Sequence, residues 1–147
     1  MRLAALPRRL GLPLCLLALG CGATFVDPTG RQESLETTQK KYTELVRWGD
    51  LQRASAYVDP ELREEFLVVA ERLGDLRMSD FEIGEIQYAG EDEVTVVVTY
   101  RAWSQTTLVE SQLRETQDWT REKGLKNVWT VRTDLPAVVA AHGPARF

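Results

Sequence analysis

Residues 93–104 read Glu-Val-Thr-Val-Val-Val-Thr-Tyr-Arg-Ala-Trp-Ser, which is the most strongly strand-like stretch of the sequence. Successive side chains of a strand point to opposite faces, so every second residue shares a face. The more apolar face would hold Val94, Val96, Val98, Tyr100 and Ala102. The other face, nearer to water, would hold Thr95, Thr99 and Arg101. The pattern predicts a long inner strand on which helices pack and neighbouring strands pair.

Helical spacing marks the segment that precedes this strand. An apolar stripe predicts a helix that begins near Ser34, a suitable N-cap residue, and runs towards Trp48. The pair Gly49-Asp50 breaks this pattern. Because an aspartate side chain can accept a hydrogen bond from a helical N–H group, Asp50 is expected to cap a continuation as far as Val58.

A second helix has stronger boundary signals. The sequence Asp59-Pro60-Glu61 is typical of a helix start, because its aspartate can cap the helix and its proline fits the first helical position. The apolar stripe that follows keeps helical spacing and stops at Gly74. One continuous helix is therefore predicted over residues 60–73, with Phe66 at the centre of its buried face.

Strand-like alternation replaces helical spacing after Gly74. The apolar phase then flips at Gly84-Glu85, which predicts a β-bulge. A third strand is less clear, because its apolar residues also fit one face of a helix; we favour a strand since the neighbouring segments need a pairing partner. The remaining predicted elements are a turn at residues 89–92, the third strand at 107–120, a turn at 122–124, the fourth strand at 127–133 and a flexible tail at 137–147.

Helices followed by about four antiparallel strands predict an α+β domain over residues 34–136, in which a curved sheet wraps around the N-terminal helices. Short motifs along this region are Arg47-Trp48-Gly49-Asp50, Asp59-Pro60-Glu61, Trp119-Thr120-Arg121-Glu122-Lys123-Gly124, Trp129-Thr130-Val131 and Asp134-Leu135-Pro136. In these motifs and in its long strand, the chain resembles the nuclear transport factor 2-like superfamily, also called the SnoaL-like fold. The resemblance implies a cone-shaped domain and carries little chemistry, because its motifs are topological.

The N-terminus carries a predicted export signal. Residues 10–19 form an apolar run that is too short for a membrane-spanning helix, which needs about 20 residues. The run ends in Leu17-Ala18-Leu19-Gly20-Cys21, where the chain resembles the bacterial lipoprotein family. The resemblance implies that residues 1–20 are a lipoprotein signal peptide and that Cys21 is lipidated. The alternative is an ordinary signal peptide that is cleaved nearby.

Cysteine usage fits a lipid anchor. The chain has two cysteines, and Cys15 would leave with the signal peptide. A lone exported thiol at Cys21 cannot form an internal disulfide bond, and lipidation would explain its presence. Residues 21–33 would then be the lipidated cysteine and a tether. Because Gly22 rather than aspartate follows the cysteine, the resemblance implies the outer membrane, facing the periplasm, in a Gram-negative host.

The charge balance argues against some partners. The whole chain has 18 basic and 22 acidic side chains. Loss of Arg2, Arg8 and Arg9 with the signal peptide would leave 15 basic against 22 acidic side chains, a net charge of −7. Such an acidic surface argues against nucleic acid and against adhesion to anionic lipid headgroups. Attachment to the membrane would therefore depend on the lipid at Cys21.

Candidate catalytic groups are few. His142 is the only histidine, and it lies in the predicted tail, where an exposed position is expected. Asp118 is the best-placed general base, although a solvent-facing carboxylate is the simpler interpretation. The spacing of His, Cys, Asp and Glu is not typical of a metal site, and no glycine-rich loop of the cofactor-binding type occurs. We therefore predict no catalytic residues, no metal and no cofactor.

Aromatic residues lie on elements that should converge in such a fold: Tyr42, Trp48, Tyr57, Tyr88, Tyr100, Trp103, Trp119 and Trp129. They predict either a packed core or an apolar pocket whose mouth some of the rings line. A third interpretation is a homodimer interface on the convex side of the sheet, formed by Val97 and Trp103.

The register of the third strand is ambiguous, because the connecting Gln105-Thr106 does not determine it. Either register places polar side chains near the apolar face of residues 93–104. One alternation directs Glu110, Gln112 and Arg114 inwards, near Tyr100. The other alternation directs inwards Val109, Ser111, Leu113, Glu115 and Gln117. In the first case Tyr100, Glu110, Gln112 and Arg114 would form the polar floor of a ligand-binding cone; the alternative is a solvated outer face.

Together these patterns predict a lipid-anchored cell-envelope protein with a non-catalytic domain that binds a ligand or a protein. Its expected partners are the membrane, through the lipid at Cys21, and a small apolar ligand or an envelope protein. The alternatives are a small-molecule enzyme of the same fold, of the isomerase or dehydratase kind, and an accessory subunit of an envelope assembly complex.

Overall fold

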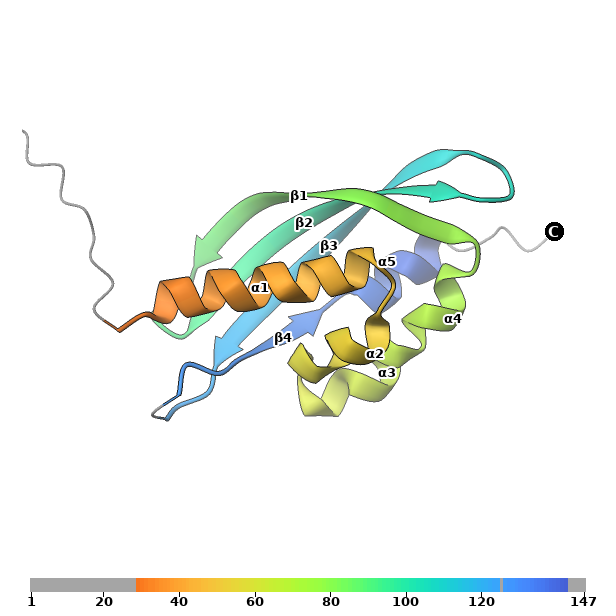
Figure 1. Cartoon of the computed structure of the whole chain (residues 1–147). Helices are drawn as coiled ribbons and strands as arrows, with labels where there is room; N and C mark the ends of the chain where they lie inside the picture. Colours follow the sequence, from red (N-terminus) through yellow and green to blue (C-terminus); the bar gives the residue numbers. More distant parts are fainter. Residues whose placement is uncertain (1–28, 125, 143–147) are drawn as a thin grey trace, which may run out of the picture.

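The computed structural model describes residues 29–124 and 126–142, and Figure 1 shows its helices packed against an open antiparallel sheet of four strands. This is the α+β fold predicted from the sequence. The predicted signal peptide, Cys21 and residues 22–28 of the tether lie outside the described residues, as do residues 143–147.

The elements follow the predicted order of helices and then strands. The helices are α1 (Arg31–Arg47), α2 (Leu51–Ala54), α3 (Arg63–Leu67), α4 (Val69–Leu73) and α5 (Leu135–His142), with 3₁₀ turns at Ser55–Tyr57 and Pro60–Leu62. The strands are β1 (Leu76–Tyr88), β2 (Glu93–Ser104), β3 (Glu110–Arg121) and β4 (Trp129–Thr133). Neighbours in the chain are also neighbours in the sheet, whose order is β1-β2-β3-β4.

β2 is an inner strand, as predicted, and it begins and ends at the residues expected from its alternation. Opposite Val98 on β2 lie Ile83 on β1 and Glu115 on β3. Directly opposed residues share a face of the sheet, so all three point inwards. The pairing of β1 with β2 shifts register between Ile83 and Ile86, which confirms the bulge predicted at Gly84-Glu85.

α1 begins earlier than predicted, because Gly30 rather than Ser34 occupies its N-cap position. Gly30 has φ 61°, a left-handed conformation that glycine adopts without a steric penalty. The Ser34 hydroxyl group instead donates a hydrogen bond of 2.9 Å to the backbone oxygen of Asn127. Asp50 caps α2 as predicted, since its side chain accepts a hydrogen bond of 3.2 Å from the N–H group of Arg53.

The single helix predicted over residues 60–73 is divided in the structure. Pro60–Leu62 forms a 3₁₀ turn, and α3 and α4 are separated at Val68. The N–H group of Val68 bonds at 3.3 Å to the carbonyl group of Glu65, three residues back, so the chain tightens there before α4 begins. α4 ends at Gly74, as predicted, where φ is 54°.

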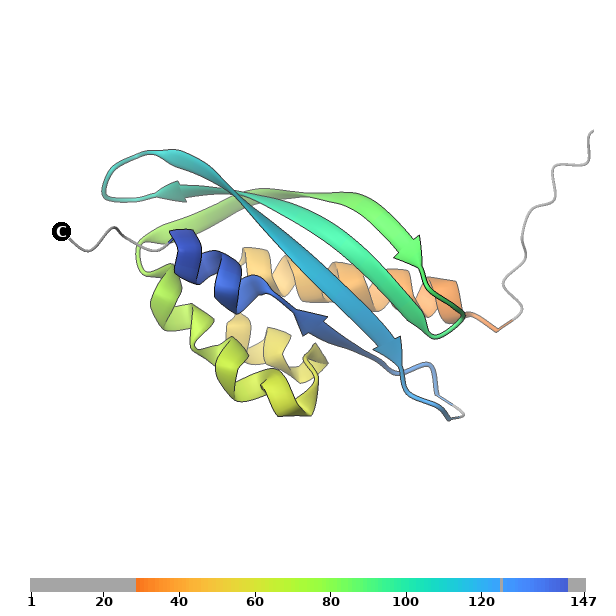
Figure 2. The same ribbon diagram turned by 180° about the vertical axis from the view of Figure 1, so that it is seen from behind.

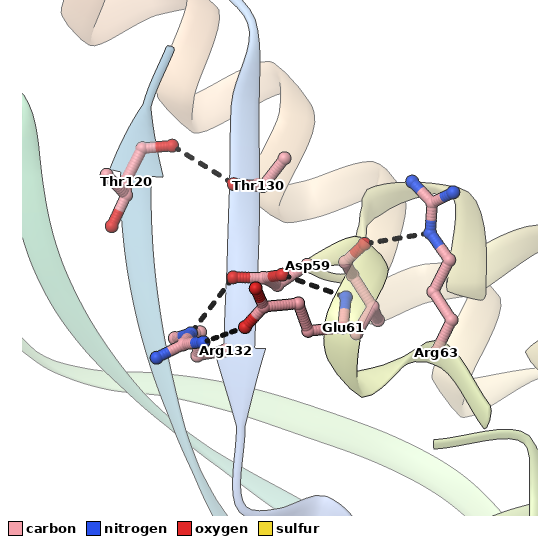
Figure 3. Close-up of polar contacts among 7 residues, drawn as sticks. Asp59, Glu61, Arg63, Thr120, Thr130 and Arg132 are labelled. Atoms are coloured by element: carbon pink, nitrogen blue, oxygen red, sulfur yellow. Dashed lines mark hydrogen bonds and ion pairs between the residues drawn. The ribbon is translucent and has the colours of Figure 1, made fainter. Parts of the chain in front are cut away.

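Figure 3 shows how the segment between α2 and α3 is joined to β4. The Nε atom of Arg132 donates to Oδ2 of Asp59 at 2.9 Å, and its Nη2 atom donates to Oε2 of Glu61 at 3.3 Å. Oδ1 of Asp59 accepts a hydrogen bond of 3.0 Å from the N–H group of Glu61, which is the capping contact predicted there. Val58 and Val131 form a parallel bridge next to these contacts, so this segment adjoins the outer edge of β4.

The expectation of a flexible tail from residue 137 is wrong for residues 137–142, which complete α5. α5 packs beside β3 and α4 (Figure 2). Leu135 and Val139 are fully buried there, and the N–H group of Leu135 donates at 3.0 Å to Oγ1 of Thr133. Burial of these two side chains favours the helix, which the sequence pattern did not reveal.

The core lies between the helices and the inner face of the sheet. Phe66 is fully buried, as predicted, with its ring centroid 6.1 Å from that of Tyr42. Every buried residue of the described chain lies between Leu35 and Val139, so a chain that begins at Gly22 retains this core whole. Within the described residues, none of the helices is long and apolar enough to cross a bilayer.

Candidate functional site

A group of polar side chains is enclosed between α1 and the inner face of the sheet. Its members come from α1, β2, β3 and β4 and are Gln39, Tyr42, Thr43, Tyr100, Glu115, Gln117 and Thr133. We call this set the Glu115 cluster, after its only carboxyl group. Because a polar group loses its hydrogen bonds to water when it is buried, the bonds inside the cluster decide whether it is stable.

Glu115 lies at the centre of the cluster and exposes none of its surface. Its Oε1 atom accepts hydrogen bonds from the hydroxyl groups of Tyr42, at 2.7 Å, and Thr133. Its Oε2 atom accepts one from the hydroxyl group of Tyr100 at 2.7 Å and one from Nε2 of Gln117 at 2.8 Å. One carboxyl group thus receives four hydrogen bonds and ties α1 to β2, β3 and β4.

The network continues from Glu115 to the middle of α1. Oε1 of Gln117 accepts hydrogen bonds from Nε1 of Trp119 at 3.1 Å and from Nε2 of Gln39 at 3.2 Å. The same Gln39 nitrogen lies 3.0 Å from Oγ1 of Thr43. These side chains are all buried, so the polar groups of the cluster satisfy one another.

Burial has the largest effect on the ionisable groups of the cluster. It raises the pKa of the Glu115 carboxyl group, because the charged form loses its hydration, and the hydrogen bonds from Thr133, Gln117 and the two tyrosines offset this only in part. Burial, together with the nearby Glu115 carboxylate, also raises the pKa of Tyr42 and of Tyr100 well above the ordinary value for tyrosine. The two phenols therefore stay protonated and act as hydrogen-bond donors.

A tyrosine together with a protonated carboxyl group in an apolar site is a combination that acid–base catalysis uses elsewhere. A catalytic acid or base must come within hydrogen-bond distance of the substrate. Glu115, Tyr42 and Tyr100 have no exposed surface, and their polar atoms bond to one another. In the described arrangement the cluster holds α1 on the sheet.

The structure does not bring the four predicted site residues together. Tyr100 is buried on the inner face, whereas Glu110, Gln112 and Arg114 lie on the outer face and are exposed. Glu110 forms an ion pair of 3.6 Å with Arg101, on the outer face of β2. Gln112 borders a shallow depression of about 260 Å³ on that face. The proposed polar floor of a cone is therefore wrong, and the alternative of a solvated outer face is correct for these three.

The second alternation considered for the third strand is the one that forms. Leu113 lies opposite Tyr100, and Trp119 lies opposite Val94, so the odd-numbered residues of β3 point inwards. Glu115 and Gln117 therefore belong to the interior, and sequence reasoning did not select them. The signal that could have selected them is the odd-numbered pair Leu113 and Trp119, because two large apolar side chains favour the buried face.

An accessible cavity adjoins the Glu115 cluster at Gln39, between α1 and β1. This α1–β1 groove has a volume of about 290 Å³ and is lined by Leu35, Glu36, Gln39 and Lys40 of α1, Ile83, Ile86 and Tyr88 of β1, and Val96 of β2. Ile83, Ile86 and Tyr88 lie opposite inward-facing residues of β2. They are nevertheless 39%, 47% and 57% exposed. The inner face of β1 is thus left partly uncovered at this groove.

The other predicted residues take several positions. Tyr42, Tyr100, Trp119 and Trp129 are buried, Tyr57 is partly buried, and Trp48, Tyr88 and Trp103 are exposed. Of this aromatic set, Tyr88 borders the α1–β1 groove. Asp118, the candidate base, is exposed and accepts a hydrogen bond of 2.7 Å from Thr95. In residues 29–124 and 126–142, no group of three or more potential metal-binding side chains comes together.

The fold is established by the structure alone, as helices packed on a four-stranded antiparallel sheet. The resemblances to the lipoproteins and to the nuclear transport factor 2-like superfamily stay predictions. No protein-family model matches the chain, and neither curated proteins nor solved structures show a significant similarity to it.

Proposed function

We propose that this protein is a lipid-anchored cell-envelope protein whose domain binds a small, mainly apolar molecule in the α1–β1 groove. The observation that carries the proposal is the row Ile83, Ile86 and Tyr88, which faces inwards yet stays partly exposed at a cavity. Apolar side chains that face the core side of a sheet are normally covered. A bound apolar molecule would cover these three and gain the free energy of their burial.

The dimensions and charges of the groove indicate the ligand. Its volume of about 290 Å³ is near the lower end of the usual range for small-molecule sites, about 300–1,000 Å³. Glu36 and Lys40 lie four residues apart on α1 and have opposite charges, so they give the groove no net charge. Gln39 is the buried polar residue of the lining. These features favour an uncharged ligand with little polar surface.

Binding rather than catalysis fits the groups in the groove. The Gln39 amide neither donates nor accepts a proton in general acid–base catalysis. Glu115 does not line the groove; it lies beyond Gln117, which bonds to both Gln39 and Glu115. The carboxyl group is therefore separated from a molecule in the groove by two glutamine side chains.

The groove can be tested with N-phenyl-1-naphthylamine, an uncharged apolar fluorophore, added to the chain that begins at Gly22. We expect saturable binding and at least about tenfold weaker binding by the double variant Ile83→Ser/Ile86→Ser, because two large apolar contacts are lost. Val109→Ser is the matched control, since Val109 is an exposed apolar residue of the β2–β3 connection, away from the groove lining. Equal affinity of the double variant and the parent would disprove the proposal.

The oligomeric state separates this proposal from its main competitor. If the groove binds a small molecule, the parent and the double variant should sediment with the same oligomeric state. A parent that sediments as a dimer, together with a monomeric double variant, would instead make the groove a homodimer interface.

The lipid anchor has its own test, which does not depend on the groove. Replacement of Cys21 by Ser should abolish incorporation of labelled fatty acid and move the protein out of the detergent phase. Cys15→Ser is the control, because Cys15 lies within the predicted signal peptide. Unchanged partitioning of the Cys21 variant would contradict lipidation while leaving the groove proposal intact.

A further inference from the structure

Another cavity, of about 310 Å³, lies where α1 ends, between α4 and the start of β1. Leu51, Leu73 and Leu76 are buried residues of its lining and provide an apolar floor. Arg47, Trp48 and Arg77 also line it. Its lining thus combines apolar side chains with two arginines, the two kinds of group that an anionic amphiphile would contact. We call this cavity the Arg47–Arg77 pocket.

The two arginines are held in place by uncharged groups. Nε and Nη2 of Arg47 donate to the carbonyl oxygen of Ser79 at 3.0 and 2.7 Å. Nη1 of Arg77 donates to the carbonyl oxygens of Gly74 at 3.0 Å and Leu76 at 2.8 Å. Backbone oxygens orient a guanidinium group without neutralising it. Both side chains therefore keep a full positive charge and have N–H groups left to donate.

No carboxyl group balances these charges inside the pocket, because none of the lining residues is acidic. The nearest acids along the chain are Glu44, Asp50 and Asp75. None of them forms an ion pair with Arg47 or Arg77 among the described residues. Asp50 forms an ion pair of 3.3 Å with Arg53, and Oδ2 of Asp75 accepts from Ser104 and from the N–H group of Thr106.

The ion pairs of the described chain involve other arginines than the two in the pocket, namely Arg31, Arg53, Arg101, Arg121 and Arg132. Two unneutralised cations in one cavity are unexpected for a chain whose net charge is negative. Their charge is available to an anion from outside the chain.

Trp48 adds an apolar surface at the same place. Its side chain is 74% exposed, and the guanidinium carbon of Arg47 lies 4.7 Å from the centre of its ring. This stacking orients the ring and the cation together. Covering an exposed aromatic ring with a hydrocarbon chain is favourable, because it removes apolar surface from water.

We propose that the Arg47–Arg77 pocket binds an anionic amphiphile, a carboxylate or phosphate group attached to a hydrocarbon chain. Arg47 and Arg77 donate charge-assisted hydrogen bonds to the anion, because the planar guanidinium group matches the geometry of carboxylate and phosphate oxygens. Trp48 and the leucine floor cover the first part of the chain. This site differs from the α1–β1 groove in both position and charge, and it does not depend on the function proposed for the groove.

The position of the pocket leaves two sources for such a ligand. α1 has 17 residues, so it is about 25 Å long at 1.5 Å per residue. It begins beside the β1–β2 turn (Figure 1), where Arg31 pairs with Glu91. Its last residues, Val46 and Arg47, line the pocket. One source is a free amphiphile, such as a fatty acid or an alkyl phosphate. The other is a lipid in a bilayer that contacts the end of the domain where α1 ends.

The test uses the chain that begins at Gly22 and calorimetric titration with four probes. Dodecanoate carries both parts of the ligand, dodecanol carries the chain alone, and inorganic phosphate carries the anion alone. Phosphatidylglycerol vesicles present the anionic amphiphile in a bilayer. We expect dodecanoate, the vesicles or both to bind at least about tenfold more tightly than dodecanol and phosphate. Binding of dodecanoate assigns a free ligand, and binding of the vesicles alone assigns a bilayer lipid.

Two variants assign the binding to this pocket. Arg47→Gln/Arg77→Gln should weaken the binding about tenfold or more, whereas Arg101→Gln, on the outer face of the sheet, should not. Trp48→Ala leaves the arginine contacts with backbone oxygens in place, and it should weaken binding several-fold. This variant tests the pocket even if Arg47→Gln/Arg77→Gln does not fold. Equal binding of dodecanol and dodecanoate, tight binding of phosphate alone, or unchanged binding by folded Arg47→Gln/Arg77→Gln or by Trp48→Ala would overturn the proposal.

Discussion

The hydroxyl group of Tyr100 donates a hydrogen bond of 2.7 Å to Oε2 of Glu115, and neither side chain exposes any surface to solvent. Tyr42 makes the equivalent contact with Oε1 at the same distance. Burying a carboxylate is costly unless hydrogen bonds replace its hydration. The hydrogen bonds of the Glu115 cluster replace this hydration only in part. The cluster also places a titratable group at the centre of the contact between α1 and the sheet.

The first prediction concerns the pH dependence of folding. Burial raises the pKa of Glu115 in the folded chain above its ordinary value of 4.5. As the pH rises above 4.5, the unfolded chain loses this proton while the folded chain keeps it. The free energy of unfolding should therefore fall with rising pH, by at most about 1.4 kcal/mol per unit, until the raised folded pKa is passed. Urea denaturation measured from about pH 5 to pH 8 would show this slope.

Glu115→Gln isolates this contribution. The variant keeps an amide that can accept and donate within the cluster, but it does not titrate, so its stability should vary less with pH over that range. Glu65→Gln is the control, because it removes one carboxyl group from an exposed position. A Glu115→Gln profile as steep as that of the parent would show that other groups cause the slope.

The strand over residues 93–104 is predictable because alternation is a local property of the sequence, and the structure has it with the same bounds. The bulge at Gly84-Glu85 is predictable for the same reason, since one flip of phase is visible within a few residues. The buried face of Phe66 follows from helical spacing. That spacing persists across Val68, which explains why the division of the helix there could not be seen.

The position of Glu115 could not be predicted, because it depends on how β2 is joined to β3. The connection at residues 105–109 contains Leu108 with φ 58°, a conformation that leucine rarely adopts and that turn rules reserve for glycine or asparagine. Local rules therefore gave no register. α5 was missed for a related reason, since the run Ala137-Val138-Val139-Ala140-Ala141 has no polar face, and only its tertiary packing reveals the helix.

The second prediction separates two roles of Asp59. The N–H group of Glu61, and next the Arg132 side chain, lower the pKa of Asp59 below its ordinary value of 3.8. The folded chain is therefore stabilised above pH 3.8, and this stabilisation is lost as the pH falls through the lowered pKa. Asp59→Asn keeps a cap acceptor without the charge, so it should reduce this acid sensitivity and cost less than about 1 kcal/mol at neutral pH.

Asp59→Ala also removes the cap acceptor, and it should therefore cost about 1 kcal/mol more than Asp59→Asn. Denaturant melts of the parent and both variants at about pH 7 and pH 3 would measure these differences. If the two variants were equally stable at neutral pH, the hydrogen bond to Glu61 would contribute nothing.

The third prediction concerns Phe66. This side chain is fully buried beside Tyr42, so Phe66→Ala should lower the free energy of unfolding by about 3 to 5 kcal/mol through lost burial and the cavity left behind. Glu65→Ala, at an exposed neighbouring position, should change it by less than about 0.5 kcal/mol. Chemical denaturation of the parent and the two variants would measure these free energies of unfolding. If Phe66→Ala lowered the free energy as little as Glu65→Ala does, this face would not anchor α3.

The last prediction compares two buried tryptophans. Nε1 of Trp119 donates to Oε1 of Gln117 at 3.1 Å, whereas Nε1 of Trp129 is buried with no hydrogen-bond partner among the described residues. An unpaired buried donor costs about 1–3 kcal/mol, and phenylalanine removes the donor while keeping an apolar ring. Trp129→Phe should therefore cost at least about 1 kcal/mol less than Trp119→Phe, which breaks the hydrogen bond to Gln117. Urea melts measure the difference, and equal costs would indicate that the Trp129 nitrogen has a partner in solution, such as water.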